Sequence, residues 1–321
     1  ITIIYIFCLL FCNVFPVKIL IICSNLVGDT VLSTGVISYF QKKYPESLIT
    51  FIAGPKAISL FNNSTNIDQI HSVKKKKFNL HWFDIYFKTI KIKWDIIVDL
   101  RSSLLSYFLA NKKKYIFKKK TNIHHILQLT QSLGFDCSNL KIDTNELEEK
   151  IAKKQIKSDF KHLIVFPGGN WEPKIWPIEK YNKMLIKLYQ SNNKIKFILV
   201  GSAEEKKDYL FNISKNIPSE NIIDIFGESL TQTAAYMKFS DLFIGNDSGL
   251  MHLSCACNLK TISLFGPTDD KIYGPWGKEN IVIRTKENLD HFNKLNLDEK
   301  KSYMDTITVD QVYQMLIKFL N

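Results

Sequence analysis

Several common signatures are missing from this sequence of 321 residues. It has no G-x-G-x-x-G motif, which argues against a dinucleotide bound after its first strand. It has no D-x-D motif, so the usual ligands of a metal-bound diphosphate are absent. Arginine occurs only at Arg101 and Arg284, so lysines would have to bind phosphate, with looser geometry than bidentate arginine.

Cysteine pairs of the metal-binding or redox type are also missing, because the six cysteines form no C-x-x-C pair. Several lie in apolar runs, where a free thiol behaves as a small hydrophobic residue, and we therefore predict a reducing, cytoplasmic compartment. His252, Cys255 and Cys257 are close in sequence, but three ligands without a fourth make a weak zinc site. We interpret them as core residues of one helix and expect no metal and no cofactor.

Long apolar runs are lacking except at the start of the chain. Residues 1–15 are almost wholly apolar, but the run is shorter than the ~20 residues that a membrane span needs. It has neither the basic region nor the cleavage site of a signal peptide. We interpret 1–16 as an upstream extension, with the folded part beginning near Val17. A short membrane-surface anchor is the alternative.

Positive charge is unevenly distributed. The net charge is +12, of which residues 17–150 contribute +9, much of it from lysine blocks at 74–77, 112–114 and 118–120. Such blocks can attract phosphate-rich partners, or they can simply be solvated surface. A nucleic-acid-binding module is a weaker interpretation, because no recognised reader motif accompanies the charge.

Short apolar runs alternate with helical segments along the chain, which is typical of doubly wound parallel sheets. The pattern runs once from 17 to 150, passes through a polar stretch at 140–161, and restarts. We therefore predict a domain at 17–150, a second at 160–305 and a C-terminal helix within 306–321. The predicted strands are 18–23, 48–53, 94–100, 162–166, 196–200, 242–244 and 261–265.

Three loops that follow predicted strands carry candidate chemistry. Asp29, in a loop at 24–30, could act as a general base or cap the next helix. Lys174 could reach a phosphate or lie on the surface. In N-D-S-G-L-M-H, residues 246–252, a helix begins whose free N–H groups suit a diphosphate, while Asp247 could bind a hydroxyl or cap that helix. Ligands of parallel sheets bind at this edge, so these loops should line one interdomain cleft.

Together, these segments resemble glycosyltransferase family 9, the lipopolysaccharide heptosyltransferases. The matching motifs are V-G-D at 27–29, P-G-G at 167–169 with K-I-W-P at 174–177, D-S-G-L-M-H at 247–252 and F-G-P-T at 265–268. Their order and separations match the family over about residues 17–280.

The resemblance implies an α/β GT-B fold, in which two Rossmann-like doubly wound parallel-sheet domains face an interdomain cleft. It also implies inverting transfer of a heptose or similar sugar from an ADP-sugar to a lipid A–core acceptor. Asp29 would be the general base, and Lys174 would contact the diphosphate. The donor-binding residues would be Gly168, Gly169, Glu205 (or else Glu204), Asp247, Ser248, Gly249, His252, Gly266 and Thr268.

Two other interpretations stay open: a GT-B sugar-nucleotide epimerase and a non-catalytic GT-B-like binding protein. The K-x-W-P and D-S-G-x-x-H motifs fit a transferase better than an epimerase, and the candidate Asp29, Lys174 and Asp247 argue against a merely binding role. We expect catalysis without a metal, because Lys174 and a helix N-terminus could offset the charge of the diphosphate. The basic N-terminal half would face the anionic acceptor or the cytoplasmic face of the inner membrane.

Overall fold

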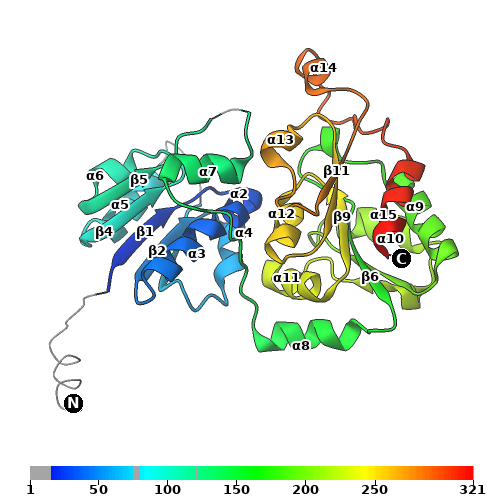
Figure 1. Cartoon of the computed structure of the whole chain (residues 1–321), viewed down its shortest axis with the longest axis horizontal. Coiled ribbons are helices and arrows are strands. Elements are labelled where there is room, and N and C mark those ends of the chain that lie inside the picture. Colours follow the sequence, from blue (N-terminus) through cyan, green and yellow to red (C-terminus); the bar gives the residue numbers. More distant parts are fainter. Residues whose placement is uncertain (1–15, 75–79, 121, 321) are drawn as a thin grey trace.

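The computed structural model describes residues 16–74, 80–120 and 122–320. Two parallel sheets lie side by side, each with helices on both faces (Figure 1). Two predicted features lie outside the described residues: the apolar extension at 1–15, and lysines 75–77 of the first basic block. Within the described ranges, no helix has the length and apolar content needed to cross a bilayer.

The N-terminal sheet is parallel throughout, with strand order β3-β2-β1-β4-β5. Its three inner strands are rich in isoleucine and other apolar residues, as expected for strands covered on both faces. The strands are β1 (Lys18–Ile22), β2 (Leu48–Ala53), β3 (Gln69–Ser72), β4 (Trp94–Asp99) and β5 (Asn111–Ile116).

Alternation along β1 divides the N-terminal core into two layers. Ile19 and Ile21 belong to one apolar cluster, and Leu20 and Ile22 belong to another on the opposite face. On the first face pack α3 (Thr34–Lys43) and α7 (His125–Leu133), with α2 (Val27–Leu32), α4 (Pro55–Ile58) and η1 (Ser59–Phe61) nearby. On the second face pack α5 (His81–Thr89) and α6 (Leu105–Phe108).

The C-terminal sheet is also parallel, with strand order β11-β10-β9-β6-β7-β8. Its inner strands are fully or almost fully buried, so this sheet also sits between helical layers. The strands are β6 (Lys161–Phe166), β7 (Ile195–Leu199), β8 (Ile222–Asp224), β9 (Leu242–Asn246), β10 (Thr261–Phe265) and β11 (Ile281–Arg284).

Helices cover both faces of this second sheet. The C-terminal helix α15 (Val309–Leu320) packs on α9 (Ile178–Ser191) through the buried Val312, Leu316 and Leu320, so it belongs to the core of this domain. The remaining helical segments are η3 (Glu172–Lys174), α10 (Lys206–Ser214), η4 (Ser219–Asn221), α11 (Leu230–Phe239), α12 (Gly249–Ala256), α13 (Asp270–Tyr273) and α14 (Leu289–Asn293).

Several contacts join the domains. The connecting helix α8 (Glu146–Gln155) begins with a capping box between Asn145 and Glu148 and packs on α11, where Gln232 Nε2 donates to the Glu148 carbonyl at 3.0 Å. Helix α2 of the first domain packs on α12 of the second. One apolar cluster runs from Ile19 in β1 to Phe166 at the end of β6, so the core is continuous across the junction.

The first loop differs from expectation. The sequence predicted a loop at 24–30 and a helix at 31–44, but α2 already begins at Val27 and a break at Ser33 separates it from α3. The break leaves Ser33 Oγ bonded to the Thr30 carbonyl at 2.7 Å, a side-chain bond that competes with the helical ladder. Asp29 therefore lies in the first turn of a helix rather than in an open loop.

Candidate active site at the domain junction

At the junction of α2 and α12, the two domains pack closely at two glycine positions. A Cβ on Gly28 would lie 2.9 Å from Cδ2 of His252, and a Cβ on Gly249 would lie 3.0 Å from Cβ of Val27. A Cβ at Gly28 would be closer than real Cβ atoms come to a neighbour, and a Cβ at Gly249 would be tighter than nine in ten real contacts, so both positions favour glycine. The V-G-D and D-S-G-x-x-H motifs, more than 200 residues apart, thus meet at the junction of α2 and α12.

Asp29 is half-buried beside this junction. Its negative charge acts on the imidazole of His125, at the start of α7, whose ring lies 6.3 Å from that of Tyr273 in the other domain. Burial lowers the pKa of His125, and the Asp29 carboxylate opposes that shift. The Nδ1 atom of His125 is buried without a hydrogen-bond partner. Asp29 and a neutral, polar imidazole therefore share the edge of the junction.

Lys174 and Asp247 form an ion pair, with Nζ and Oδ2 3.2 Å apart and the side chains only 13% and 9% exposed. Lys174 ends η3, and Asp247 follows β9, so the pair joins two loops at the carboxyl edge of the second sheet. For a buried ion pair of this kind, the cost of desolvating both charges can cancel their attraction, so the pair adds little net stability. It fixes a positive charge at the edge where an anionic ligand would bind.

Asn246 holds the same two loops together and was not predicted from the sequence. Its fully buried side chain accepts hydrogen bonds from the Trp176 backbone N–H at 3.0 Å and from the Tyr181 hydroxyl at 3.2 Å. Its Nδ2 donates to the carbonyls of Pro167 and Gly168 at 3.0 and 2.9 Å. One side chain therefore fixes both the P-G-G turn and the residues that follow Lys174.

Glu205 connects the loops after β6 and β7. One carboxylate oxygen accepts from the Gly169 backbone N–H at 3.1 Å, and the other accepts from the Ser202 N–H at 2.7 Å. A Cβ on Gly168 would come within 2.2 Å of Glu205 Oε1, which explains the need for glycine there. Glu204 is exposed, and hydrogen bonds lower its pKa. The choice between the two as a ribose-binding residue therefore stays a prediction.

Ser248 caps helix α12, since its Oγ accepts from the Met251 N–H at 3.2 Å. Capping by Asp247, one of the two roles considered for that residue, is therefore wrong, because its carboxylate pairs with Lys174 instead. His252, one turn into α12, is buried. Burial, with smaller effects from His124, His125 and Lys174, lowers the pKa of His252 to about 3, so its imidazole is neutral near pH 7.

The loop after β10, which carries Gly266 and Thr268, is organised by Arg284. The guanidinium donates to the carbonyl of Gly266 at 2.5 Å and to that of Thr268 at 2.9 Å, and it also pairs with Asp270. The Thr268 hydroxyl is buried and has no partner. One of the only two arginines in the chain is therefore committed to this loop, which sequence reasoning missed.

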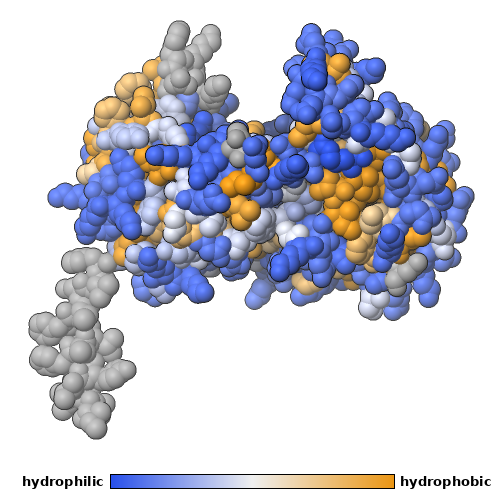
Figure 2. Space-filling view, turned by 45° about the horizontal axis from the view of Figure 1, so that its top comes forward, coloured by the Kyte–Doolittle hydropathy of each residue, from blue (hydrophilic) through white to orange (hydrophobic). Residues whose placement is uncertain are grey.

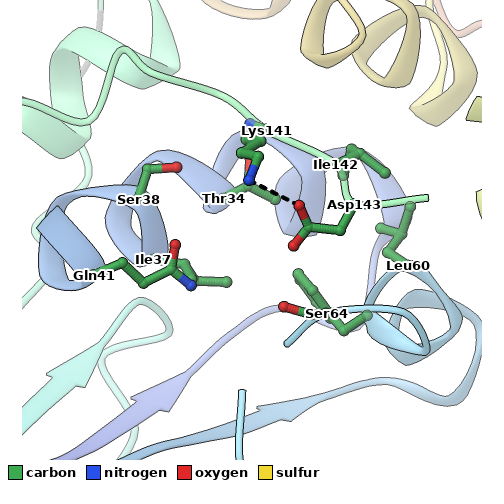
Figure 3. A pocket seen from close by; sticks show the side chains of 10 residues that line it. Thr34, Ile37, Ser38, Gln41, Leu60, Ser64, Lys141, Ile142 and Asp143 are labelled. Atoms are coloured by element: carbon green, nitrogen blue, oxygen red, sulfur yellow. Dashed lines mark hydrogen bonds and ion pairs between the residues drawn. The ribbon is translucent and has the colours of Figure 1, made fainter. Parts of the chain in front are cut away.

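A surface pocket lies away from this junction. It is formed by α3, η1 and the segment around 141–143, and Lys141 pairs with Asp143 at its edge at 2.9 Å (Figure 3). None of the predicted site residues lines it. Across 16–74, 80–120 and 122–320, no group of three or more His, Cys, Asp or Glu side chains is arranged to hold a metal.

Comparisons with known proteins point to one family. The family model "Glycosyltransferase family 9 (heptosyltransferase)" matches residues 87–302. Lipopolysaccharide heptosyltransferase 3 of Escherichia coli is 22% identical, over 91% of this chain and 96% of that protein.

Two solved structures show the same fold. A family 9 glycosyl transferase from Veillonella parvula has a TM-score of 0.78 at 22% identity, covering 94% of this chain and 97% of that one. E. coli ADP-heptose lps heptosyltransferase II has a TM-score of 0.72 at 18% identity, covering 94% and 98%. The predicted GT-B fold is confirmed, and the chain belongs to glycosyltransferase family 9, the heptosyltransferase family.

Proposed function

We propose that this glycosyltransferase moves a heptose from ADP-heptose to the lipid A–core acceptor of lipopolysaccharide, with inversion at the anomeric carbon. The observation that carries the proposal is the meeting of the two domains. Asp29 of the first domain lies beside Gly28, which packs on His252 of the second, and Lys174 acts electrostatically on the same His252. A carboxylate and a cation from different domains thus face one junction.

In the proposed reaction, Asp29 takes the proton of the acceptor hydroxyl as that oxygen bonds to the anomeric carbon of the donor. The bond from this carbon to the diphosphate oxygen breaks, and ADP leaves. General-base catalysis of this kind contributes typically ~10²–10⁴-fold. Nucleophile and leaving group lie on opposite faces of the sugar, which gives inversion.

Charge builds up on the departing diphosphate, and offsetting that charge is often the largest catalytic effect. In this proposal, two groups of the chain would do so. The ammonium of Lys174 is held by Asp247, and the first N–H groups of α12 are free of intrahelical partners and carry the positive end of the helix dipole. Neutral His252 adds a polar group without a competing charge.

The donor preference can be tested by thermal shift. A ligand that binds only the native state raises the melting temperature, and at equal concentration the tighter ligand raises it more. We expect ADP-heptose and ADP to raise Tm more than UDP- or GDP-linked sugars at equal concentration. Equal shifts for all three nucleotides, or a preference for UDP, would contradict the proposed donor. The proposed place of action is the cytoplasmic face of the inner membrane, where the acceptor is lipid-linked.

A further inference from the structure

Exposed apolar side chains gather on one side of the N-terminal domain. Among the described residues, seven of the fourteen large hydrophobic side chains that are exposed lie between 80 and 108. We define the aromatic patch as Phe83, Phe87, Leu104, Tyr107 and Phe108, which are 61%, 68%, 76%, 62% and 68% exposed. Figure 2 shows apolar side chains on that end of the molecule, where Figure 1 places α5 and α6.

The patch is the outer surface of a helical layer whose inner surface already has a partner. Ile85 of α5 and Leu105 of α6 are buried in one apolar cluster with the sheet. Phe83 and Phe87 lie four residues apart and so share one face of α5, opposite that core. The helix is therefore apolar on two faces, and a stable fold accounts for only one of them. Contiguous exposed apolar surface of this kind usually marks an interaction site.

The segment that carries the patch is strongly basic. Residues 80–120 contain ten Lys or Arg and three Asp or Glu. Two of these carboxylates are already engaged: Asp99 is fully buried and accepts from the backbone N–H of Ser103 at 2.7 Å, and Asp95 pairs with Lys112 at 2.7 Å. Lys114 Nζ lies 4.5 Å from the centre of the Tyr107 ring. Aromatic rings and lysines thus occupy one surface.

We infer that the aromatic patch is a docking surface for a bilayer of anionic lipid. Aromatic side chains suit the interface between water and lipid, and lysines near an anionic surface attract it. A second copy of the chain fits less well, because pairing the patch with itself would bring two basic surfaces together.

The position of the patch also fits an acceptor carried by lipid. Leu104 follows Arg101 by three residues, and the Arg101 guanidinium donates to Asn25 Oδ1 at 3.2 Å. Asn25 lies in the loop between β1 and α2, four residues before Asp29. The patch therefore begins beside the loop that leads to the proposed base. In this respect the inference rests on the proposed function, since it supplies the surface on which a lipid-linked acceptor would be met.

The test is binding of the full chain to vesicles, without donor or acceptor. Vesicles containing phosphatidylglycerol are compared with vesicles of phosphatidylcholine alone. We expect the triple change Phe83→Ser, Phe87→Ser and Phe108→Ser to weaken binding to the anionic vesicles at least about tenfold. Phe211→Ser is the matched control, because Phe211 is 70% exposed on α10 of the other domain. The control should bind like the unchanged chain.

The charge contribution is tested separately. Lys88→Gln, Lys91→Gln and Lys113→Gln together should weaken binding to anionic vesicles roughly 10²-fold and leave the phosphatidylcholine result unchanged. The same change at the exposed Lys183, Lys207 and Lys215 of the C-terminal domain is the charge-matched control and should weaken binding much less. Equal losses in both triples would mean that net charge, not this surface, governs binding, and would overturn the inference.

Hydrogen exchange locates the contact. Amides of α5 and α6 should exchange more slowly when anionic vesicles are added, and those of α10 should not change. Undiminished vesicle binding by the Phe→Ser triple would overturn the inference, as would a concentration-dependent dimer abolished by that triple. The vesicle experiment contains no donor or acceptor, so its result does not depend on sugar transfer. If a separate assay showed no sugar transfer, that result would contradict the proposed function alone. Likewise, failed vesicle binding would leave the proposed transferase chemistry standing.

Discussion

Individual side chains at the junction have distinct electrostatic states that determine what each can do. Asp29 is half-buried, Lys174 is held by Asp247 at 3.2 Å, and His252 is buried and neutral. The proposed function assigns the proton transfer to Asp29, the carboxylate that α2 brings to the junction. Its role and that of His252 can be separated by different measurements.

Replacing Asp29 with Asn removes the proposed base and keeps the size of the side chain. We expect turnover to fall ~10²–10⁴-fold. Binding of ADP-heptose, measured by calorimetry or thermal shift, should persist, because the proposed donor site lies in the other domain. Turnover within about twofold of the unchanged chain would exclude a general-base role, since even the weakest such roles exceed this effect.

The buried histidine predicts a dependence of stability on pH. The pKa of His252 is about 3 in the folded chain, against an ordinary value near 6.5. Below about pH 6.5 the unfolded chain binds the proton more readily, so the stability that neutral His252 provides is lost as the pH falls towards 3. Between pH 6.5 and 5 the loss should be about 2 kcal/mol.

Other buried histidines add to this effect, because the pKa values of His124, His125 and His162 are also lowered. The measurement is therefore a difference between variants. The free energy of unfolding of His252→Gln should fall less between pH 6.5 and 5 than that of the unchanged chain. The same decrease in both would show that His252 does not contribute.

At the scale of elements, loops rather than helices or strands form the proposed donor side of the site. The segment 167–177 and the end of β9 are joined through Asn246, whose four hydrogen bonds span 2.9 to 3.2 Å. Because its polar partners are buried, losing it leaves several of them unsatisfied, at a cost of ~1–3 kcal/mol each.

We therefore expect Asn246→Ala to lower the free energy of unfolding by roughly 3 kcal/mol. It should also weaken the thermal shift produced by ADP, because the loop before Lys174 loses its anchor. Chemical denaturation measures the first effect. Asn212→Ala is the control, because Asn212 is exposed and its side chain bonds only within α10, to the Asp208 carbonyl at 2.8 Å. Matching stabilities for the two variants would refute the anchoring role of Asn246.

The strands that sequence reasoning found and missed differ in one physical respect. All the predicted strands lie inside the sheets, where burial on both faces selects unbroken apolar runs. The missed strands, β3, β5, β8 and β11, are the edges of the two sheets. Edge strands tolerate polar and charged side chains. Strand β5 (Asn111–Ile116) contains three lysines, so the sequence indicated a basic block there and not a strand.

The candidate site could also be predicted only in part. Motifs confined to a few residues, such as 27–29 and 247–252, identified the two surfaces that meet. The pairing of Lys174 with Asp247 and the anchoring role of Asn246 could not be read from the chain, because the partners are more than 60 residues apart. Such contacts depend on which loops the strand order brings together.

At the scale of the whole molecule, two sheets share one continuous core, and loops at their carboxyl edges meet at the junction where the proposed base and the proposed charge-stabilising groups lie. Under the proposed function, each domain would bind one substrate, and the protein itself would supply the positive charge that faces the diphosphate.

That arrangement predicts catalysis without a divalent cation. Lys174 and the N-terminus of α12 can offset the charge of the leaving group, so initial rates should be unchanged when excess EDTA is added. Rates measured with EDTA, and again after Mg²⁺ is restored, check this expectation. Loss of all activity in EDTA and its recovery with Mg²⁺ would show that a metal supplies the charge.

The most direct test of the account is transfer itself, followed by mass spectrometry and by NMR of the anomeric centre. With ADP-heptose and a lipid A–core acceptor, the account predicts an acceptor heavier by one heptose residue, an equal amount of ADP, and an anomeric configuration opposite to that of the donor. Retained configuration, or a donor altered while no acceptor is present, would contradict it.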